Sequence, residues 1–95
     1  MDNCTKPMSF EEALSALKNG SRIFRAAWAD KMRFVAMQKG YPDGIPCNSN
    51  TAEAFGFNVG TNVVVNPYLQ MWDGGALVTY VPSQADMFAE DWHII

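Results

Sequence analysis

The segment PSQADMFAEDW, residues 82–92, gathers the side chains whose types and spacing suit acid chemistry. Asp86 and Glu90 lie four residues apart, so on a helix their carboxylates share one face and a metal bridge between them is geometrically possible. Metal-dependent phosphoester cleavage, however, usually draws three or more ligands from several elements, and the single histidine, His93, has no evident relay partner. We interpret Ser83 and Asp86 as the cap of a short helix instead, with the Asp86 carboxylate bonding back to the Ser83 backbone. No catalytic residue, metal ligand or cofactor is expected.

The basic residues suggest a different kind of site. The chain is acidic, with a net charge of -3, yet six of its seven basic residues fall within one stretch: Lys18, Arg22, Arg25, Lys31, Arg33 and Lys39. Trp28 lies among them, in a segment with a turn-like pattern. An aromatic ring that stacks on a base, beside an arginine that meets a phosphate, suits a nucleotide. Two structural alternatives remain open: the basic residues solvate a strand edge, or Trp28 fills the core between helix and sheet.

Composition limits the possible classes of protein. With 95 residues, 48% hydrophobic and 18% charged, the chain is expected to form a single globular domain over 1–95, with residues 1–8 as a loose N-terminal segment. The acidic balance argues against binding to long nucleic acid. The N-terminus has no apolar signal core and no run is long enough to span a bilayer, so a cytoplasmic protein without membrane contact is expected. Cys4 and Cys47 indicate neither a disulfide framework nor a zinc site.

Local patterns predict the elements that position these residues. Ser9 and Glu12 form a capping-box pattern that starts an amphipathic helix, and Gly20 ends it. Strands are expected at 22–26, 32–38, 63–65, 68–72 and 76–81, with residues 92–95 closing as an edge strand.

Two further patterns complete the expected fold. Residues 39–62 are loop-like, with one helical turn that Asn50 and Glu53 cap and Gly56 ends. The short helix that begins at Ser83 follows the last long strand. The prediction is an α+β fold: a small antiparallel sheet with an N-terminal amphipathic helix and a short C-terminal helix.

Five segments carry a resemblance to a known family. In order they are FEEALSALKNG, RAAW, GYPDGIPCNSNTAEAFG, PYLQMWDGG and VPSQADMFAEDW, spanning Phe10 to Trp92. Together they resemble a family of small phage and prophage proteins associated with Thoeris anti-defence, the second of that name. The resemblance implies a non-enzymatic sponge that acts in the host bacterial cytoplasm. Such proteins form homotetramers and sequester the cyclic ADP-ribose isomer that a TIR-domain protein makes as an alarm signal, and some members also hold cyclic oligonucleotides.

The resemblance also implies which residues hold the ligand. Arg25 and Trp28 match the family's Arg-x-x-Trp element, and Tyr80 stands where many relatives carry tryptophan. The start of the last helix offers backbone N–H groups that suit a phosphate, and the Asn-rich segment 48–51 is placed to read base or ribose edges. The expected ligand-binding residues are Arg25, Trp28, Asn48, Asn50, Thr51, Tyr80, Ser83, Gln84 and Asp86.

Two other functions remain as alternatives to the sponge. The first is a metal-dependent phosphodiesterase of a nucleotide signal that uses Asp86, Glu90 and Asp91. The second is a protein-interaction module that inhibits a host enzyme through an aromatic surface. Metal dependence identifies the first, and capture of a protein partner without nucleotide identifies the second.

Overall fold

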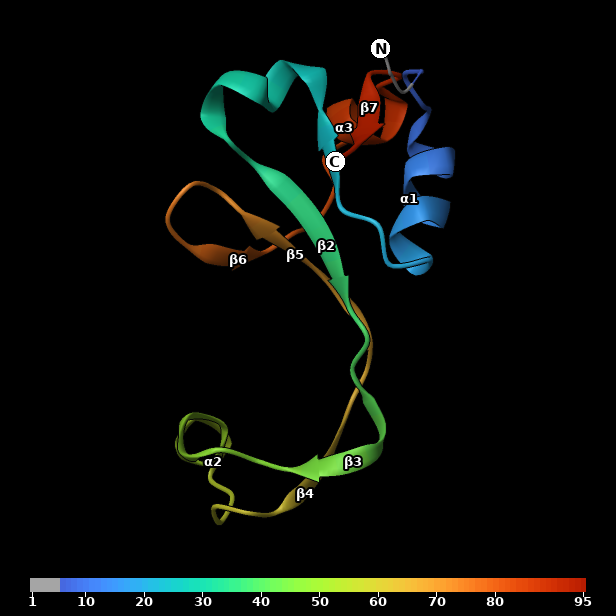
Figure 1. Ribbon diagram of the computed structural model, residues 1–95. Helices are drawn as coiled ribbons and strands as arrows, with labels where there is room; N and C mark the ends of the chain where they lie inside the picture. The colour runs from blue at the N-terminus through green and yellow to red at the C-terminus, as the bar shows by residue number, and fades with distance from the viewer. Residues whose placement is uncertain (1–5) are drawn as a thin grey trace. The chain divides into compact units, whose positions relative to one another are not determined.

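The computed structural model describes residues 6–95, with the backbone alone described at 29–31. The chain forms two compact units, each described by itself: unit one contains residues 6–38 and 69–95, and unit two contains Lys39–Tyr68. Figure 1 labels most of their helices and strands. The single domain over 1–95 stays a prediction.

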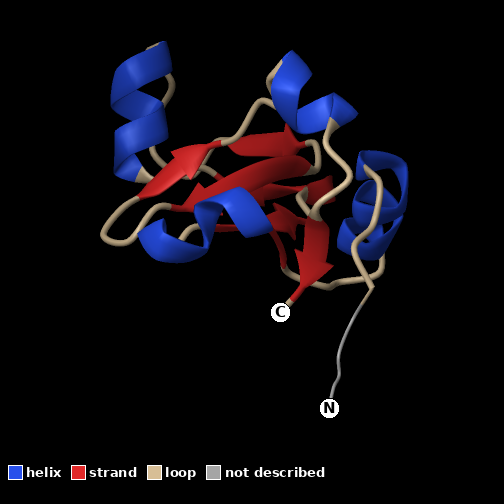
Figure 2. Ribbon diagram, turned by 90° about the horizontal axis from the view of Figure 1, so that it is seen from above, coloured by secondary structure: helices blue, strands red, loops and turns tan. Residues whose placement is uncertain are grey.

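Unit one is built on a five-stranded sheet. Its strands, in spatial order, are β6 (Leu77–Thr79), β5 (Tyr68–Trp72), β2 (Phe34–Gln38), β1 (Ile23–Arg25) and β7 (Trp92–Ile94). β1 pairs antiparallel with both neighbours, so that Ile23 lies opposite Val35 on one side and Ile94 on the other. β7, which runs to the C-terminus marked in Figure 2, is an edge strand as expected.

Helix α1 (Phe10–Lys18) covers one face of this sheet. Its capping box is present as predicted: the Ser9 backbone N–H donates to Glu12 Oε1 at 3.0 Å, and the Glu12 N–H donates to Ser9 Oγ at 3.3 Å. The helix ends at Lys18, and Gly20 follows with a positive φ of 95°, which favours a residue without a Cβ. The buried side chains of α1 are Ala13 and Leu17, which face the sheet.

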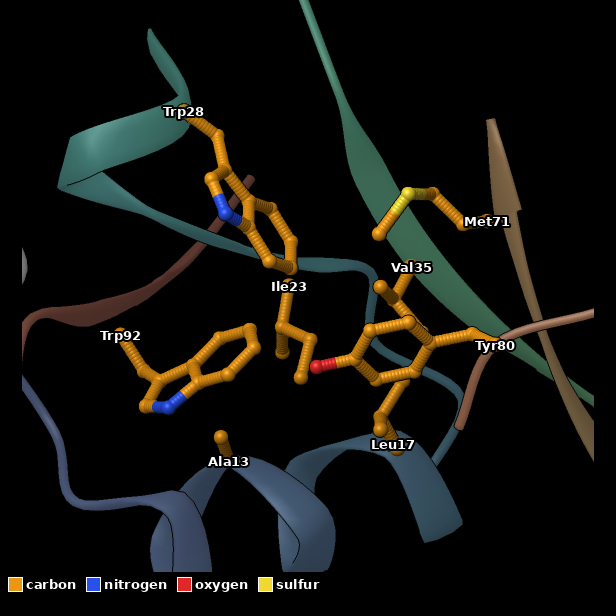
Figure 3. Close-up of a cluster of buried hydrophobic side chains, with 8 residues drawn as sticks. All are labelled: Ala13, Leu17, Ile23, Trp28, Val35, Met71, Tyr80 and Trp92. Carbon is orange, nitrogen blue, oxygen red and sulfur yellow. The ribbon is translucent and has the colours of Figure 1, made fainter. Parts of the chain in front are cut away.

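The core of unit one lies between α1 and the sheet. Figure 3 shows the rings of Trp92 and Tyr80 above Ala13 and Leu17, with Trp28 closing the cluster from the connection between β1 and β2. That connection is a 3₁₀ helix, η1 (Ala26–Lys31). Three of the eight buried side chains of this cluster are aromatic, namely Trp28, Tyr80 and Trp92. An aromatic side chain buries about 150–250 Å², so these three supply much of the buried surface.

The N-terminal segment expected to be loose is held at one point. Residues 1–5 of that segment lie outside the described residues. Met8, by contrast, exchanges two backbone hydrogen bonds with Trp92: Met8 N to Trp92 O at 2.8 Å and Trp92 N to Met8 O at 3.2 Å. Within residues 6–95, none of the helices is both long and apolar enough to cross a membrane.

Unit two contains a strand pair that the sequence patterns missed. The expected loop over 39–62 is wrong in its first part, because Tyr41–Pro46 forms β3 and pairs antiparallel with β4 (Asn62–Val65). The register shifts between Tyr41 and Ile45, and Gly44 sits in this irregularity with φ 92°. Gly and Pro lower the strand propensity of this stretch, but the ladder with β4 overrides that local preference.

Helix α2 (Ser49–Phe55) lies between β3 and β4 along the chain. It ends at Gly56 as predicted, with φ 75°. The predicted cap is wrong by two residues: Asn48, not Asn50, is the N-cap, and its Oδ1 accepts from the Thr51 N–H at 2.9 Å. Asn50 already lies inside the helix. Both residues fit a cap by type, and Asn48 is the one whose backbone is extended, with ψ 176°.

The remaining predictions of secondary structure are confirmed: β5 has the predicted bounds, β4 begins one residue earlier, and the other predicted strands are shorter. The β5–β6 hairpin turns at Asp73, whose N–H donates to Ala76 O at 3.1 Å. The short C-terminal helix is α3 (Gln84–Phe88), and Ser83 is its N-cap. The fold class is the predicted α+β, with antiparallel strands, an N-terminal helix and a short C-terminal helix.

Candidate functional site

Four polar side chains meet where β1 ends, and we call them the Arg25 cluster: Arg25, Tyr80, Asp86 and Asp91. Arg25 is the last residue of β1 and lies opposite Trp92 in the register with β7. That pairing places Asp91, the residue before β7, next to Arg25. Asp86 enters from α3 and Tyr80 from the end of the β6 segment. The Arg25 guanidinium thus meets two carboxylates that lie 61 and 66 residues later in the chain, and Tyr80 joins the cluster through Asp86.

Each oxygen of the two carboxylates in the cluster accepts a hydrogen bond. Arg25 Nη1 donates to Asp86 Oδ1 at 3.0 Å, and Arg25 Nε donates to Asp91 Oδ1 at 2.8 Å. The Tyr80 hydroxyl donates to Asp86 Oδ2 at 2.7 Å, and the Ala27 N–H donates to Asp91 Oδ2 at 3.3 Å. Each carboxylate oxygen thus has a named donor, which satisfies the charge in a partly buried place.

The Asp86 carboxylate is held in its charged form. Burial alone raises the pKa of this carboxyl, but hydrogen bonds from Tyr80, Arg25 and the Ser83 backbone together outweigh burial and leave the pKa below its ordinary value. The Ser83 contribution agrees with the predicted helix cap. The same carboxylate does more than cap, because it also binds Tyr80 and Arg25 across the core.

The pKa values of the other three groups in the cluster are shifted as well. Burial, followed by the hydrogen bond to Asp86, raises the pKa of the Tyr80 hydroxyl well above its ordinary value. The hydrogen bond from Arg25 lowers the pKa of Asp91, and the hydrogen bond to Asp91 raises the pKa of Arg25. The cluster therefore keeps Tyr80 neutral, both aspartates negative and Arg25 positive.

Trp28 lies in the core of the single chain, next to the cluster. Its side chain is 6% exposed, and its ring centroid lies 6.0 Å from that of Tyr80 and 5.2 Å from that of Trp92, both edge-to-face. The Arg33 guanidinium carbon lies 5.2 Å from the Trp28 ring centroid. In this structure Trp28 therefore fills the core between helix and sheet, one of the two structural alternatives left open by the sequence. Stacking of a ligand base on Trp28 stays a prediction.

Ser83 and Gln84 stand at the start of α3, one turn from Asp86. Ser83 Oγ accepts from the Asp86 N–H at 3.1 Å, so the serine hydroxyl serves as the helix cap. Both Ser83 and Gln84 are exposed. The predicted residues of unit one, namely Arg25, Trp28, Tyr80, Ser83, Gln84 and Asp86, are therefore brought together around one end of the sheet.

The three other predicted site residues belong to unit two. Asn48 and Asn50 are exposed at the start of α2, while Thr51 is half-buried. The Asn48 side chain already binds the Thr51 N–H as the helix cap. Unit two therefore offers exposed amide groups at α2, separately from the Arg25 cluster.

The sequence patterns did not identify the roles of Asp91 and Trp92. Asp91 is a main partner of Arg25, and Trp92 is fully buried with its indole Nε1 donating to Asp86 O at 3.0 Å. One feature of the sequence could have indicated the role of Asp91. Arg25 lies two residues after Ile23 on the same strand, so its side chain is on the same face as the buried Ile23. A charged residue on a core-facing strand position requires a carboxylate partner.

The arrangement is suited to holding a shape rather than exchanging protons. A general acid or base needs a pKa near the working pH and a proton within reach of the substrate. Asp86 and Tyr80 are shifted away from neutrality in opposite directions and bind each other. Across the part of the chain that the structure describes, no three metal-ligating side chains gather as a candidate ion site.

Comparison with known proteins identifies the family. The family model described as Thoeris anti-defense 2-like domain matches residues 8–95. The chain is also 33% identical over 88 residues to Thoeris anti-defense 2 of Bacillus phage SP01, an alignment that covers 93% of this chain and 94% of that protein. A match over nearly the whole chain, on both counts, means that the protein described here belongs to the Thoeris anti-defense 2-like family.

Proposed function

We propose that this phage anti-defence protein is a sponge: it binds a cyclic nucleotide immune signal, the cyclic ADP-ribose isomer made by a TIR-domain protein, and does not degrade it. The family membership supports the anti-defence role. The signal and the sponge mechanism are the proposal. The protein acts as a homotetramer in the host cytoplasm and needs no cofactor.

The observation that carries the proposal is that the carboxylates of Asp86 and Asp91 already accept hydrogen bonds from groups of the protein. Asp86 and Asp91 are two of the three carboxylates that a phosphodiesterase would use, and all four of their carboxylate oxygens accept hydrogen bonds inside the protein. A hydrolytic role would require these oxygens to release Arg25 and Tyr80 and turn to a metal or a water. Removing a charge from such a pair carries a large free-energy cost, so holding is favoured over cutting.

The predicted residues have two roles in the proposed binding. Ser83 and Gln84 in unit one, and Asn48, Asn50 and Thr51 in unit two, supply polar contacts to phosphate, ribose or base edges. Arg25, Tyr80 and Asp86 hold one another by hydrogen bonds and so fix the start of α3 at one end of the sheet of unit one. Trp28 supports this end through the core and, once a ring face is uncovered, stacks on the base.

The test separates stoichiometric capture from turnover. A trace of enzyme consumes a large excess of substrate with time, whereas a sponge holds only as much as it has sites. The protein is incubated with excess cyclic ADP-ribose isomer and Mg²⁺ or Mn²⁺, and bound nucleotide is then released by heat. The supernatant is assayed by chromatography and by its ability to activate the downstream effector.

Stoichiometric loss before heating and full recovery of intact nucleotide afterwards, with or without EDTA, is the expected result. The matched variant is Glu90→Gln, which removes the one carboxylate of the three that lies outside the Arg25 cluster. A hydrolysed product that grows with time and disappears in Glu90→Gln would contradict the sponge. Capture of a host enzyme without any nucleotide uptake would favour an interaction module instead.

A further inference from the structure

One edge of the five-stranded sheet has no neighbouring strand in the described residues. That edge is β6, which pairs only with β5, and the register between the two strands is Gln70↔Thr79, Met71↔Val78 and Trp72↔Leu77. Two further backbone hydrogen bonds flank this ladder: Tyr80 N to Leu69 O at 3.0 Å and Asp73 N to Ala76 O at 3.1 Å.

These flanking bonds determine which backbone groups point outward. In an antiparallel ladder, hydrogen-bonded and non-hydrogen-bonded pairs alternate. Because positions 76 and 80 bond to β5, Val78 shares their orientation, and Leu77 and Thr79 direct their N–H and C=O groups away from β5. The free edge of β6 therefore presents two complete sets of backbone donors and acceptors.

The side chains along this edge give it no protection against pairing. Leu77 is 61% exposed and Val78 is 40% exposed. Residues 74–85 carry no charged side chain, although native edge strands commonly use charge, proline or a bulge to prevent association. Since each copy carries a net charge of -3, an uncharged edge is where two copies meet with the least repulsion.

From this geometry we propose that two copies of the chain pair through their β6 edges, antiparallel across a two-fold axis at Val78. Leu77 of each copy exchanges backbone hydrogen bonds with Thr79 of the other, and the two Val78 side chains face each other as a non-hydrogen-bonded pair. The same edge serves both copies, as a two-fold interface requires. The inference rests on the oligomer of the proposed function and adds the surface and register by which copies join.

Cysteine cross-linking tests the register. In a non-hydrogen-bonded antiparallel pair the Cα atoms are about 4.5 Å apart, which lies within the range that a disulfide spans. Val78→Cys should therefore give a disulfide-linked dimer under mild oxidation. Leu77→Cys is the matched control, because the two copies of residue 77 lie on a diagonal about 7–8 Å apart. At least ~10-fold more dimer from Val78→Cys than from Leu77→Cys or the wild type is expected on a non-reducing gel.

Charge placed on the edge tests the surface without relying on oxidation. Leu77→Lys should lower the mass measured by light scattering, while Val64→Lys, at an equally exposed position of β4 (both 61%), should leave it unchanged. A wild-type mass of one chain would overturn the inference. So would dissociation by Val64→Lys alone, or equal cross-linking at positions 77 and 78.

A failure of the proposed β6 pairing can be distinguished from a failure of the proposed sponge function. Nucleotide capture is measured on the same cross-linked and charged variants by the heat-release assay. Cross-linking at Val78 without nucleotide capture would retain the pairing and reject the sponge. Capture by a protein that does not cross-link at Val78 would retain the sponge and reject this pairing.

Discussion

Tyr80 donates its phenolic hydrogen to Asp86 Oδ2 over 2.7 Å, within the core of unit one. The contact joins the chain that leaves β6 to the helix that follows it. Because Asp86 also binds Arg25, the tyrosine is linked through one carboxylate to the end of β1. The stability and shape of this end of the sheet therefore depend on a small number of polar contacts.

Tyr80→Phe removes one donor from Asp86 and keeps the ring. Because a hydrogen bond to a charged group contributes about 1.5–3 kcal/mol, the unfolding free energy should fall by roughly that amount. Urea denaturation followed by circular dichroism measures it. Tyr68→Phe is the control, since that side chain is 41% exposed, and its loss should stay within about 0.5 kcal/mol. Equal losses in the two variants would show that the Tyr80 hydroxyl contributes nothing specific.

Arg25→Met leaves Asp86 and Asp91 without their counter-charge. The expected loss of unfolding free energy is roughly 2–3 kcal/mol, below the 3–5 kcal/mol of fully buried pairs because the cluster is partly exposed to solvent. The exposed Arg22, changed to Met, is the control and should cost little. A double-mutant cycle with Asp86→Asn measures the coupling. A coupling of zero would mean that the two side chains do not interact in solution.

Acid should weaken the protein through the same cluster. The folded-state pKa of Asp86 lies below its ordinary value of 3.8, so the stabilisation is complete above that value and is lost as the pH falls through the folded pKa. The stability advantage of the wild type over Asp86→Asn should therefore shrink below about pH 4. Urea denaturation at several pH values measures this difference. A constant difference from neutral pH to pH 3 would contradict the lowered pKa.

Trp28→Ala removes the largest side chain contributed by the β1–β2 connection. Its ring is 6% exposed, so the cavity should cost about 3–5 kcal/mol of unfolding free energy. Trp72→Ala, at a ring that is 36% exposed, is the matched control and should cost clearly less. Trp28→Phe retains most of the packing. If nucleotide capture is lost in Trp28→Phe while stability is kept, the indole itself contacts the ligand.

Gly40 and Gly56 separate the effect of crowding from that of backbone conformation. Both have φ 75°, but a Cβ on Gly40 would collide with the carbonyl oxygen of Val65, whereas nothing lies within 4 Å at Gly56. Gly56→Ala should cost about 1–2 kcal/mol for the left-handed conformation alone. Gly40→Ala should cost roughly 1–3 kcal/mol more, because the backbone of β4 cannot move aside easily. Thermal unfolding of both variants tests the order, and equal costs would show that the hairpin relaxes.

The sequence by itself determined the features that depend on neighbours a few residues apart. The capping box at Ser9 and Glu12 and the Ser83 cap are hydrogen bonds within three residues of chain. Residue type is enough to predict such contacts, because few competing partners lie within reach. The family resemblance is likewise a property of the residues in order, and it is confirmed.

Only the tertiary structure decided how these elements use their side chains. Arg25 binds Asp86 and Asp91 across 61 and 66 residues of chain, and β3 forms from a Gly- and Pro-containing stretch because β4 is there to pair with it. Trp28 is buried because α1, Tyr80 and Trp92 close around it. Such contacts depend on which distant segments meet, and the local sequence around a strand or a charged residue is compatible with many different partners. Packing and burial in the folded chain select one of these partners, so local propensity alone cannot predict it.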